Sequence, residues 1–228
     1  MKSNIGKLVR SLVLCSALLG FHVSADDGTQ THYERLPKSE FVFNESDSKH
    51  HKEDLAIEVV YFFNNNCPAC THFTPIISDW FKEMPVENVN LIMAPYPTHP
   101  DWIWSTILYF AAEDINPDYD IFDIHQVLIE NDAIISQRDE VIAFLMNRVG
   151  ADYLTAEEYA SVERYEDKIA TIVELFDSYE AKGTPNVGIT ASNGERFLVG
   201  PQHNKTFTEM ITAINGISAY ILEYTHNM

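Results

Sequence analysis

The chain contains two apolar runs with a helix-like segment between them. Residues 55–63 are almost continuously apolar and rich in Val, Ile and aromatic side chains, which is typical of a strand buried on both faces of a sheet. Three asparagines at residues 64–66 end this run. Apolar residues then recur with helical spacing over residues 68–84, where we expect Pro75 to kink the helix, and residues 89–94 form a second apolar run. Strand, helix and strand in this order predict two parallel strands.

Residues 100–182 are predicted to be helical throughout. Their pattern gives four helices, over residues 101–113, 121–130, 138–149 and 155–179. The fourth has Thr155 as its N-cap with Glu158 in the matching capping-box position, and it stops before Gly183. After this block, residues 186–190 and 196–199 alternate as the two strands of a hairpin, and residues 206–224 predict a last helix.

The order of these elements predicts one α/β domain that is interrupted by a helical insertion. Residues 26–99 form its first part, residues 100–182 the insertion, and residues 183–228 its second part. Residues 26–54 are polar, and we expect them to be irregular apart from a possible short strand at 41–43. The chain is 46% hydrophobic, which is enough for a sizeable core.

The first 25 residues have the pattern of a secretory signal peptide. A basic start, an apolar stretch and a small-residue cleavage site follow one another: Lys2, Lys7 and Arg10, then residues 12–21, then Val23-Ser24-Ala25. The apolar stretch is too short to span a bilayer. A lipid anchor at Cys15 fits less well, because Leu14 precedes it where a small residue is wanted. We therefore expect an exported chain that begins near Asp26.

Acidic residues dominate the charge of the chain. The formal net charge is −19, and removal of residues 1–25 takes away three of the fifteen basic residues and no acidic one, which leaves −22 on 203 residues. So negative a surface argues against nucleic acid or an anionic membrane as a direct partner. Solubility is the simplest reason for the charge.

Cys67-Pro68-Ala69-Cys70 lies between the first predicted strand and the first predicted helix. A cysteine at a helix N-terminus faces unpaired backbone N–H groups, which favour the reactive thiolate. Cys70 lies one helical turn further on, close enough to attack a mixed disulfide that Cys67 has formed. The spacing predicts a redox pair in which Cys67 is the nucleophile and Cys70 the resolving thiol.

Two other roles for this cysteine pair fit less well. A structural disulfide over so short a loop would constrain little of the unfolded chain. A metal site would need a second pair of Cys or His ligands, and His50-His51 is better explained as part of a solvated loop. We expect no metal and no other cofactor.

A second motif follows the insertion, where Gly183-Thr184-Pro185 precedes the predicted hairpin. Together with residues 62–70, the insertion and the N-terminal segment, this arrangement resembles the DsbA family of exported thiol oxidases, over essentially all of the mature chain. Pro75, eight residues after Cys67, is also similar to the kinking proline of thioredoxins. The resemblance implies a thioredoxin-like fold with an inserted helical subdomain, and a periplasmic location.

The resemblance also implies how a substrate is bound. Thr184-Pro185 is expected to be a cis bond beside the cysteines, where the backbone of Thr184 pairs with an extended substrate segment, and Pro68 and Ala69 complete the contact surface. The residues alone would suggest only an ordinary proline at the start of a strand, since cis X-Pro bonds are a minority of roughly one in twenty.

The implied activity is donation of the Cys67–Cys70 disulfide to reduced, unfolded exported proteins. The resemblance further implies a monomer that is reoxidised by a membrane quinone reductase of the DsbB type. Two alternatives stay open: a reductase or isomerase of the same fold, and a peptide-binding chaperone module that uses no thiol chemistry. An isomerase would usually add an N-terminal dimerisation domain, for which the residues before the first strong strand are too few.

The chain departs from the family pattern at two positions. The best-known members carry His where this chain has Ala69, which predicts a less acidic Cys67 and a milder oxidant. A buried carboxylate commonly stands where this chain has Tyr61. Glu58 cannot simply replace it, because an offset of three along a strand reverses the face.

Overall fold

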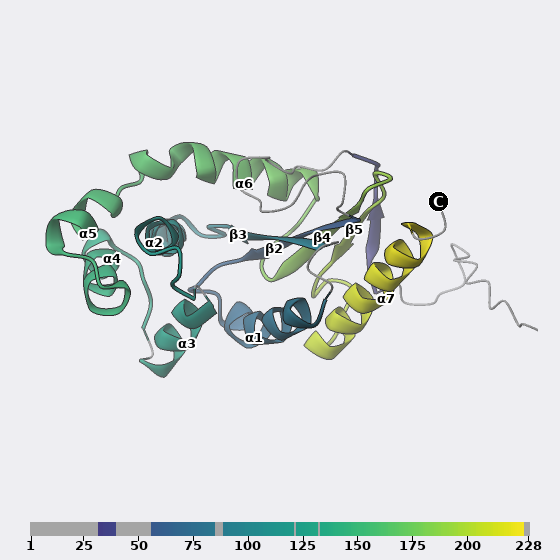
Figure 1. The fold of residues 1–228 in the computed structure, drawn as a ribbon, viewed down its shortest axis with the longest axis horizontal. Coiled ribbons are helices and arrows are strands. Elements are labelled where there is room, and N and C mark those ends of the chain that lie inside the picture. Colours follow the sequence, from purple (N-terminus) through teal and green to yellow (C-terminus); the bar gives the residue numbers. More distant parts are fainter. Residues whose placement is uncertain (1–31, 40–55, 85–88, 121, 132, 226–228) are drawn as a thin grey trace, which may run out of the picture. The chain divides into compact units, whose positions relative to one another are not determined.

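The computed structural model describes residues 32–39, 56–84, 89–120, 122–131 and 133–225. The signal-peptide prediction, the possible strand at 41–43 and the His50-His51 pair lie outside these residues. The predicted α/β class is confirmed: helices cover both faces of a mixed sheet (Figure 1).

The sheet of the described chain has five strands in the order β1-β5-β4-β2-β3. Their bounds are β1 Glu34–Leu36, β2 Ile57–Phe63, β3 Val89–Pro95, β4 Asn186–Ala191 and β5 Arg196–Val199. The predicted parallel pair is β2 and β3, and β4 and β5 form the predicted hairpin and pair antiparallel. Every residue of β2 is buried, as its continuous apolar pattern indicates.

β1 is a strand that the sequence pattern does not predict. Its three residues pair antiparallel with β5, with Arg35 opposite Phe197. Only Leu36 of the three is buried. So short an edge strand has no periodicity of its own, and its partner lies in the last quarter of the chain, so the expectation of irregular backbone here is wrong.

Helices lie on both sides of the sheet. Their bounds are α1 Pro68–Glu83, α2 Ile103–Ile115, α3 Phe122–Glu130, α4 Arg138–Phe144, α5 Tyr153–Tyr159, α6 Glu166–Ser178 and α7 Phe207–Thr225. α1 and α7 lie on one side of the sheet and α6 on the other (Figure 1). α2 to α6 all come from residues 100–182. α1 continues without interruption through Pro75.

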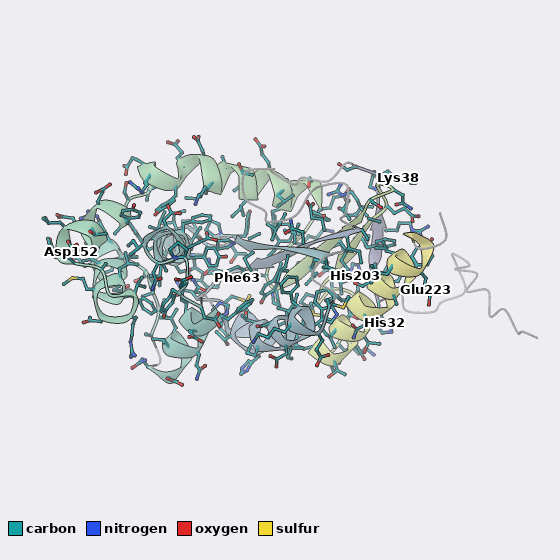
Figure 2. The ribbon with its side chains drawn as sticks, viewed as in Figure 1. His32, Lys38, Phe63, Asp152, His203 and Glu223 are labelled. Atoms are coloured by element: carbon teal, nitrogen blue, oxygen red, sulfur yellow. The ribbon has the colours of Figure 1, made fainter. Side chains whose placement is uncertain are left out.

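The fourth predicted helix is in fact two helices. α5 begins at an N-cap that is Asp152, whose carboxylate accepts hydrogen bonds from the backbone N–H of Thr155 at 3.1 Å and from its hydroxyl at 2.8 Å. Asp152 lies at this end of α5 in Figure 2. Thr155 is therefore not the cap. The helical path breaks at Ala160, and a single 3₁₀ turn at Glu163–Tyr165 leads into α6.

An arginine from another helix stabilises this break. The Arg138 side chain donates to the carbonyl of Glu157 at 2.6 Å and to that of Ala160 at 2.8 Å. These carbonyls belong to the last turn of α5, where no intrahelical N–H reaches them. α5 can therefore end in the middle of a sequence whose apolar spacing favours one long helix.

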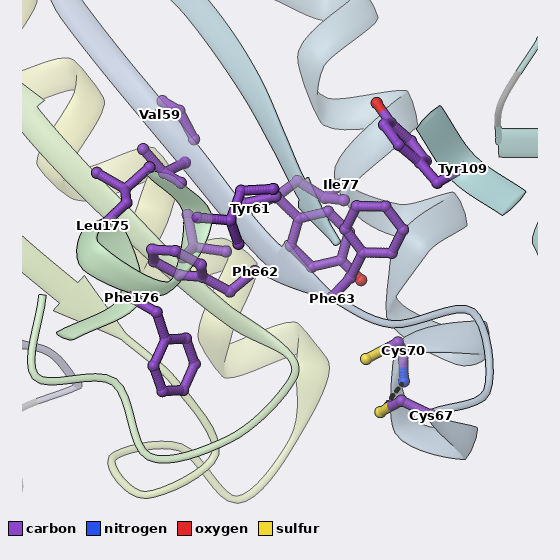
Figure 3. Packing of buried hydrophobic residues seen from close by; sticks show 14 of the residues in the cluster. Val59, Tyr61, Phe62, Phe63, Cys67, Cys70, Ile77, Tyr109, Leu175 and Phe176 are labelled. Atoms are coloured by element: carbon purple, nitrogen blue, oxygen red, sulfur yellow. Dashed lines mark hydrogen bonds between the residues drawn. The ribbon is translucent and has the colours of Figure 1, made fainter. Parts of the chain in front are cut away.

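The core consists of two layers of aromatic side chains on opposite faces of β2. Phe62 packs edge-on against Phe176 of α6, with ring centroids 5.3 Å apart. Tyr61 packs against Phe73 of α1 at 5.8 Å, and Phe63 packs against Tyr109 of α2 at 5.4 Å. Figure 3 shows the side chains of Tyr61, Phe62 and Phe63 with their neighbours Tyr109 and Phe176. This packing fixes the strand end that carries the cysteine motif.

Candidate active site

Cys67 is the N-cap residue of α1, as its position between strand and helix predicts. Its backbone is extended, with φ −81° and ψ 114°, and Pro68 begins the helix. The Cys67 Sγ accepts a hydrogen bond from the backbone N–H of Cys70 at 3.3 Å, drawn as a dashed line in Figure 3. The sulfur therefore takes the place that the side-chain oxygen of a capping residue would occupy. Both cysteines are free thiols.

The cis peptide bond that the family resemblance implies is present between Thr184 and Pro185. The Cys67 thiol donates a hydrogen bond to the Thr184 carbonyl at 3.4 Å. The structure therefore brings together two motifs that are 117 residues apart in the chain. Pro68 is exposed, and Ala69 and Thr184 are half-buried, whereas Pro185 is buried. The residues predicted to contact a substrate thus lie on both sides of Cys67.

The surroundings of Cys67 favour its thiolate. Its pKa is lowered from 9.0 to about 6, chiefly by the hydrogen bond with the Cys70 thiol, and further by the Thr184 side chain and the backbone N–H groups of Cys70 and Ala69, against the effect of burial. This value lies above the extreme of about 3.5 found among the most acidic cysteines of such motifs. That Ala69 makes Cys67 less acidic than a His at this position would stays a prediction.

Cys70 has the opposite character. Its side chain is fully buried, and burial raises its pKa well above the ordinary value, as does its interaction with Cys67. At neutral pH the pair therefore holds one negative charge, on the outer sulfur. In such an arrangement the Cys67 sulfur can act as nucleophile or leaving group, whereas Cys70 stays a neutral thiol.

Tyr61 lies in the core next to this buried thiol. Its hydroxyl shares a hydrogen bond of 2.9 Å with the hydroxyl of Thr74, which lies one helical turn after Cys70 in α1. Burial raises the pKa of Tyr61 well above 10, and the interaction with Cys70 adds to the rise. Tyr61 is therefore a neutral phenol at every physiological pH. Glu58 lies on the other face of β2, as the alternation of the strand predicts. There, burial raises the pKa of Tyr179, which follows α6, and the charge of Glu58 adds to the rise.

The three asparagines before Cys67 are site residues whose role the sequence pattern does not reveal. We expect them only to end a strand, yet all three are buried. Their side chains bond to Tyr96 just after β3, to α2 and to the loop before α4. The only sign of this role in the sequence is the run of three asparagines directly before Cys67. The sequence does not reveal their hydrogen-bond partners, because these lie 32 to 69 residues further along the chain.

Asn186 is a second residue that the sequence pattern does not single out. It directly follows Pro185, and its side-chain amide donates to the carbonyl of Gly183 at 2.8 Å. Its amide oxygen accepts from the side chain of Gln202 at 3.1 Å. Asn186 thereby ties the loop that carries Thr184 to the segment between β5 and α7.

The described part of the chain contains no group of three or more His, Cys, Asp and Glu side chains that could hold a metal ion. None of its helices is both long and apolar enough to cross a membrane.

A family model described as thioredoxin matches residues 52–215. The chain belongs to the thioredoxin family. The matched segment holds the cysteine motif, the insertion, the Thr184-Pro185 bond and the first half of α7. No curated protein matches the sequence significantly.

Solved structures share the fold of this thioredoxin-family chain. DsbA from Pseudomonas aeruginosa matches with a TM-score of 0.63 and 16% identity over 86% of this chain and 93% of that one. Reduced DsbA1 from Neisseria meningitidis matches with a TM-score of 0.62 and 15% identity, over 90% and 100% of the two chains. DsbA from Xylella fastidiosa matches with 0.61 and 19%, over 72% and 86%. The thioredoxin-like fold with its inserted helices is therefore the fold of DsbA.

Proposed function

We propose that this protein is an exported thiol:disulfide oxidoreductase that gives its Cys67–Cys70 disulfide to folding proteins in the periplasm. The observation that carries the proposal is the position of the Cys67 sulfur. It caps α1, its pKa is about 6, and it lies against the Thr184 carbonyl beside a cis proline. Membership of the thioredoxin family and the DsbA fold support the same reaction class.

The reaction follows from the different character of the two sulfurs. A substrate thiolate attacks the Cys67 sulfur of the oxidised protein, the Cys67–Cys70 bond breaks, and Cys70 leaves and takes up a proton. A second substrate thiolate attacks the substrate sulfur of the mixed disulfide, and Cys67 leaves as the stabilised thiolate. The substrate gains a disulfide, and the protein holds two electrons as one thiol and one thiolate.

The surface around Cys67 suits an extended substrate segment. Pro68 is exposed, and Ala69 and Thr184 are partly exposed. A backbone edge can pair with an incoming strand. Reduced, unfolded exported proteins are the substrates we propose. A quinone-linked membrane reductase of the DsbB type would then reoxidise the protein, which would act as a monomer without nucleic acid, metal or cofactor.

Oxidative refolding of a reduced, unfolded protein tests this proposal. The oxidised wild type should restore disulfides and activity to the substrate, and Cys67→Ser and Cys70→Ser should not. Cys70→Ser should also accumulate a mixed disulfide through Cys67. Equal refolding with all three proteins would reject the thiol mechanism and leave a peptide-binding chaperone. A reduction potential near the value of about −270 mV of thioredoxin would favour a reductase.

A further inference from the structure

The described chain holds a group of buried amides that links the cysteine motif to the helical insertion. We propose that Asn64, Asn65 and Asn66 are positioning residues, which we name the asparagine clamp, and that they fix the start of α1 on the insertion and thereby set the reactivity of Cys67. This inference rests on the proposed function, because it concerns the same sulfur, but its test does not require a protein substrate.

Asn66 provides the closest link between the two regions. Its side-chain N–H donates to the carbonyl of Ile135 at 2.7 Å, and its side-chain oxygen accepts from the N–H of Ile135 at 3.0 Å. One amide group thus pairs with both polar groups of one backbone residue, in the manner of a strand. Ile135 lies between α3 and α4, and Asn66 directly precedes Cys67. The Asn66 side chain therefore ties the position of the reactive cysteine to the insertion.

Asn64 connects the same turn to two further elements. Its side-chain N–H groups donate to the Tyr96 carbonyl after β3 at 3.2 Å and to the Thr106 hydroxyl in α2 at 3.3 Å. Its side-chain oxygen accepts from the Ser105 hydroxyl at 2.6 Å and from the N–H of Asn66 at 3.0 Å. The amide is thus fully used, with partners from the segment after β3, the insertion and the turn itself.

The backbone of Asn64 completes the connection to Cys67. Its carbonyl accepts a hydrogen bond from the N–H of Cys67 at 3.0 Å. Asn65 adds a bond from its side-chain N–H to the Ser105 carbonyl at 3.0 Å. The turn from Asn64 to Cys67 is thus closed by its own backbone and held on α2 by two side chains.

A strand can end without burying three polar side chains, so these asparagines do more than end β2. A buried polar side chain stabilises the fold only where its hydrogen bonds are made, and loss of a partner exposes the cost of its burial. The bonds made here all restrain the backbone that directs the Cys67 side chain. Its Sγ accepts from the N–H of Cys70 in the extended N-cap conformation of Cys67. A looser turn would therefore weaken the bonds that stabilise the thiolate.

Titration of the Cys67 thiolate by its absorbance, with its rate of reaction with a small disulfide such as oxidised glutathione, tests the clamp. Asn66→Ala should raise the Cys67 pKa. At pH 5 each rise of one in that pKa lowers the thiolate fraction by about tenfold and slows the reaction accordingly. Ser105→Ala removes one bond to Asn64 from within α2 and should shift the pKa in the same direction by less. This second variant leaves the turn itself unchanged, so it provides the test if Asn66→Ala does not fold.

Tyr179→Phe is the matched control, because it removes a buried hydrogen bond of 2.6 Å to Thr190 of β4, which pairs with Glu58 in the sheet and not with the turn before Cys67. It should lower stability and leave the Cys67 titration as in the wild type. The inference would be overturned if Asn66→Ala and Ser105→Ala kept the Cys67 pKa and reaction rate of the wild type. It would also be overturned if Tyr179→Phe changed the Cys67 pKa as much as they do. Failure of the proposed function would appear instead in the refolding assay, while the titration would still report the clamp.

Discussion

At the scale of single residues, Tyr61 places a neutral hydroxyl group in the core beside Cys70. Its partner Thr74 is buried as well, and the two hydroxyls are 2.9 Å apart. Since Tyr61 cannot ionise at physiological pH, it can act on the buried sulfur only as a hydrogen-bonding dipole. This chain therefore keeps Cys70 next to a polar group without placing a second titrating group there.

The hydrogen bond between Tyr61 and Thr74 should stabilise the fold, and either substitution alone should remove it. We expect Tyr61→Phe to lower the free energy of unfolding by about 1–2 kcal/mol, because the Thr74 hydroxyl loses its partner in the core. Thr74→Val should cost a similar amount. Urea unfolding of both single variants and the double variant measures their coupling, which we expect to be about 1 kcal/mol. Strictly additive losses would show that the observed hydrogen bond contributes nothing.

The acidity of Cys67 makes the stability of the reduced protein depend on pH. Its pKa is lower in the folded chain, about 6, than the ordinary 9.0. The thiolate therefore stabilises the fold fully above about pH 9, and this stabilisation is lost as the pH falls through 6. The size of the effect grows with the difference between the two pKa values.

Urea unfolding under reducing conditions at pH 5, 7 and 9 measures this linkage. The wild type should gain free energy of unfolding relative to Cys67→Ala as the pH rises. The oxidised wild type has no thiol at this position, so it should not show the gain. A parallel pH dependence of the reduced wild type and Cys67→Ala would contradict the low pKa.

At the scale of elements, the sequence predicts structure well where one segment contains its own pattern. β2, α1 and β3 follow from their own apolar spacing, and Cys67 falls at the helix N-terminus as expected. β1 and the break between α5 and α6 are different, because a distant partner decides each of them. β5 determines β1, and Arg138 satisfies the carbonyls that the break exposes. The asparagine clamp escapes prediction for the same reason.

The end of α5 should therefore depend on the guanidinium of Arg138. Its two bonds reach the carbonyls of Glu157 and Ala160 at once, and a lysine ammonium lacks the planar fork that allows this. We expect Arg138→Lys to lower the free energy of unfolding by about 1–2 kcal/mol in spite of the conserved charge. Thermal unfolding measures the loss, and a melting temperature equal to that of the wild type would show that charge alone suffices.

At the scale of the whole molecule, the site is assembled from segments that are distant in sequence. The helix start supplies the sulfurs, the Thr184-Pro185 loop lies against Cys67, and the insertion holds the turn before it. No single segment contains the site, so its geometry also depends on residues that are not part of it. Gly200, at the end of β5, is one such residue.

Gly200 should be required for the position of the Thr184-Pro185 loop. A Cβ atom at this residue would overlap the side-chain oxygen of Asn186, whose amide holds the Gly183 carbonyl. Gly200→Ala must therefore displace Asn186, and we expect it to lower the free energy of unfolding by about 1–3 kcal/mol and to slow mixed-disulfide formation with a cysteine peptide. Gly216→Ala is the matched control, because a Cβ in that helix would contact nothing within 4 Å, and it should stabilise the protein by about 0.5–1 kcal/mol. Similar stabilities and exchange rates for the two variants would show that the loop does not depend on Asn186.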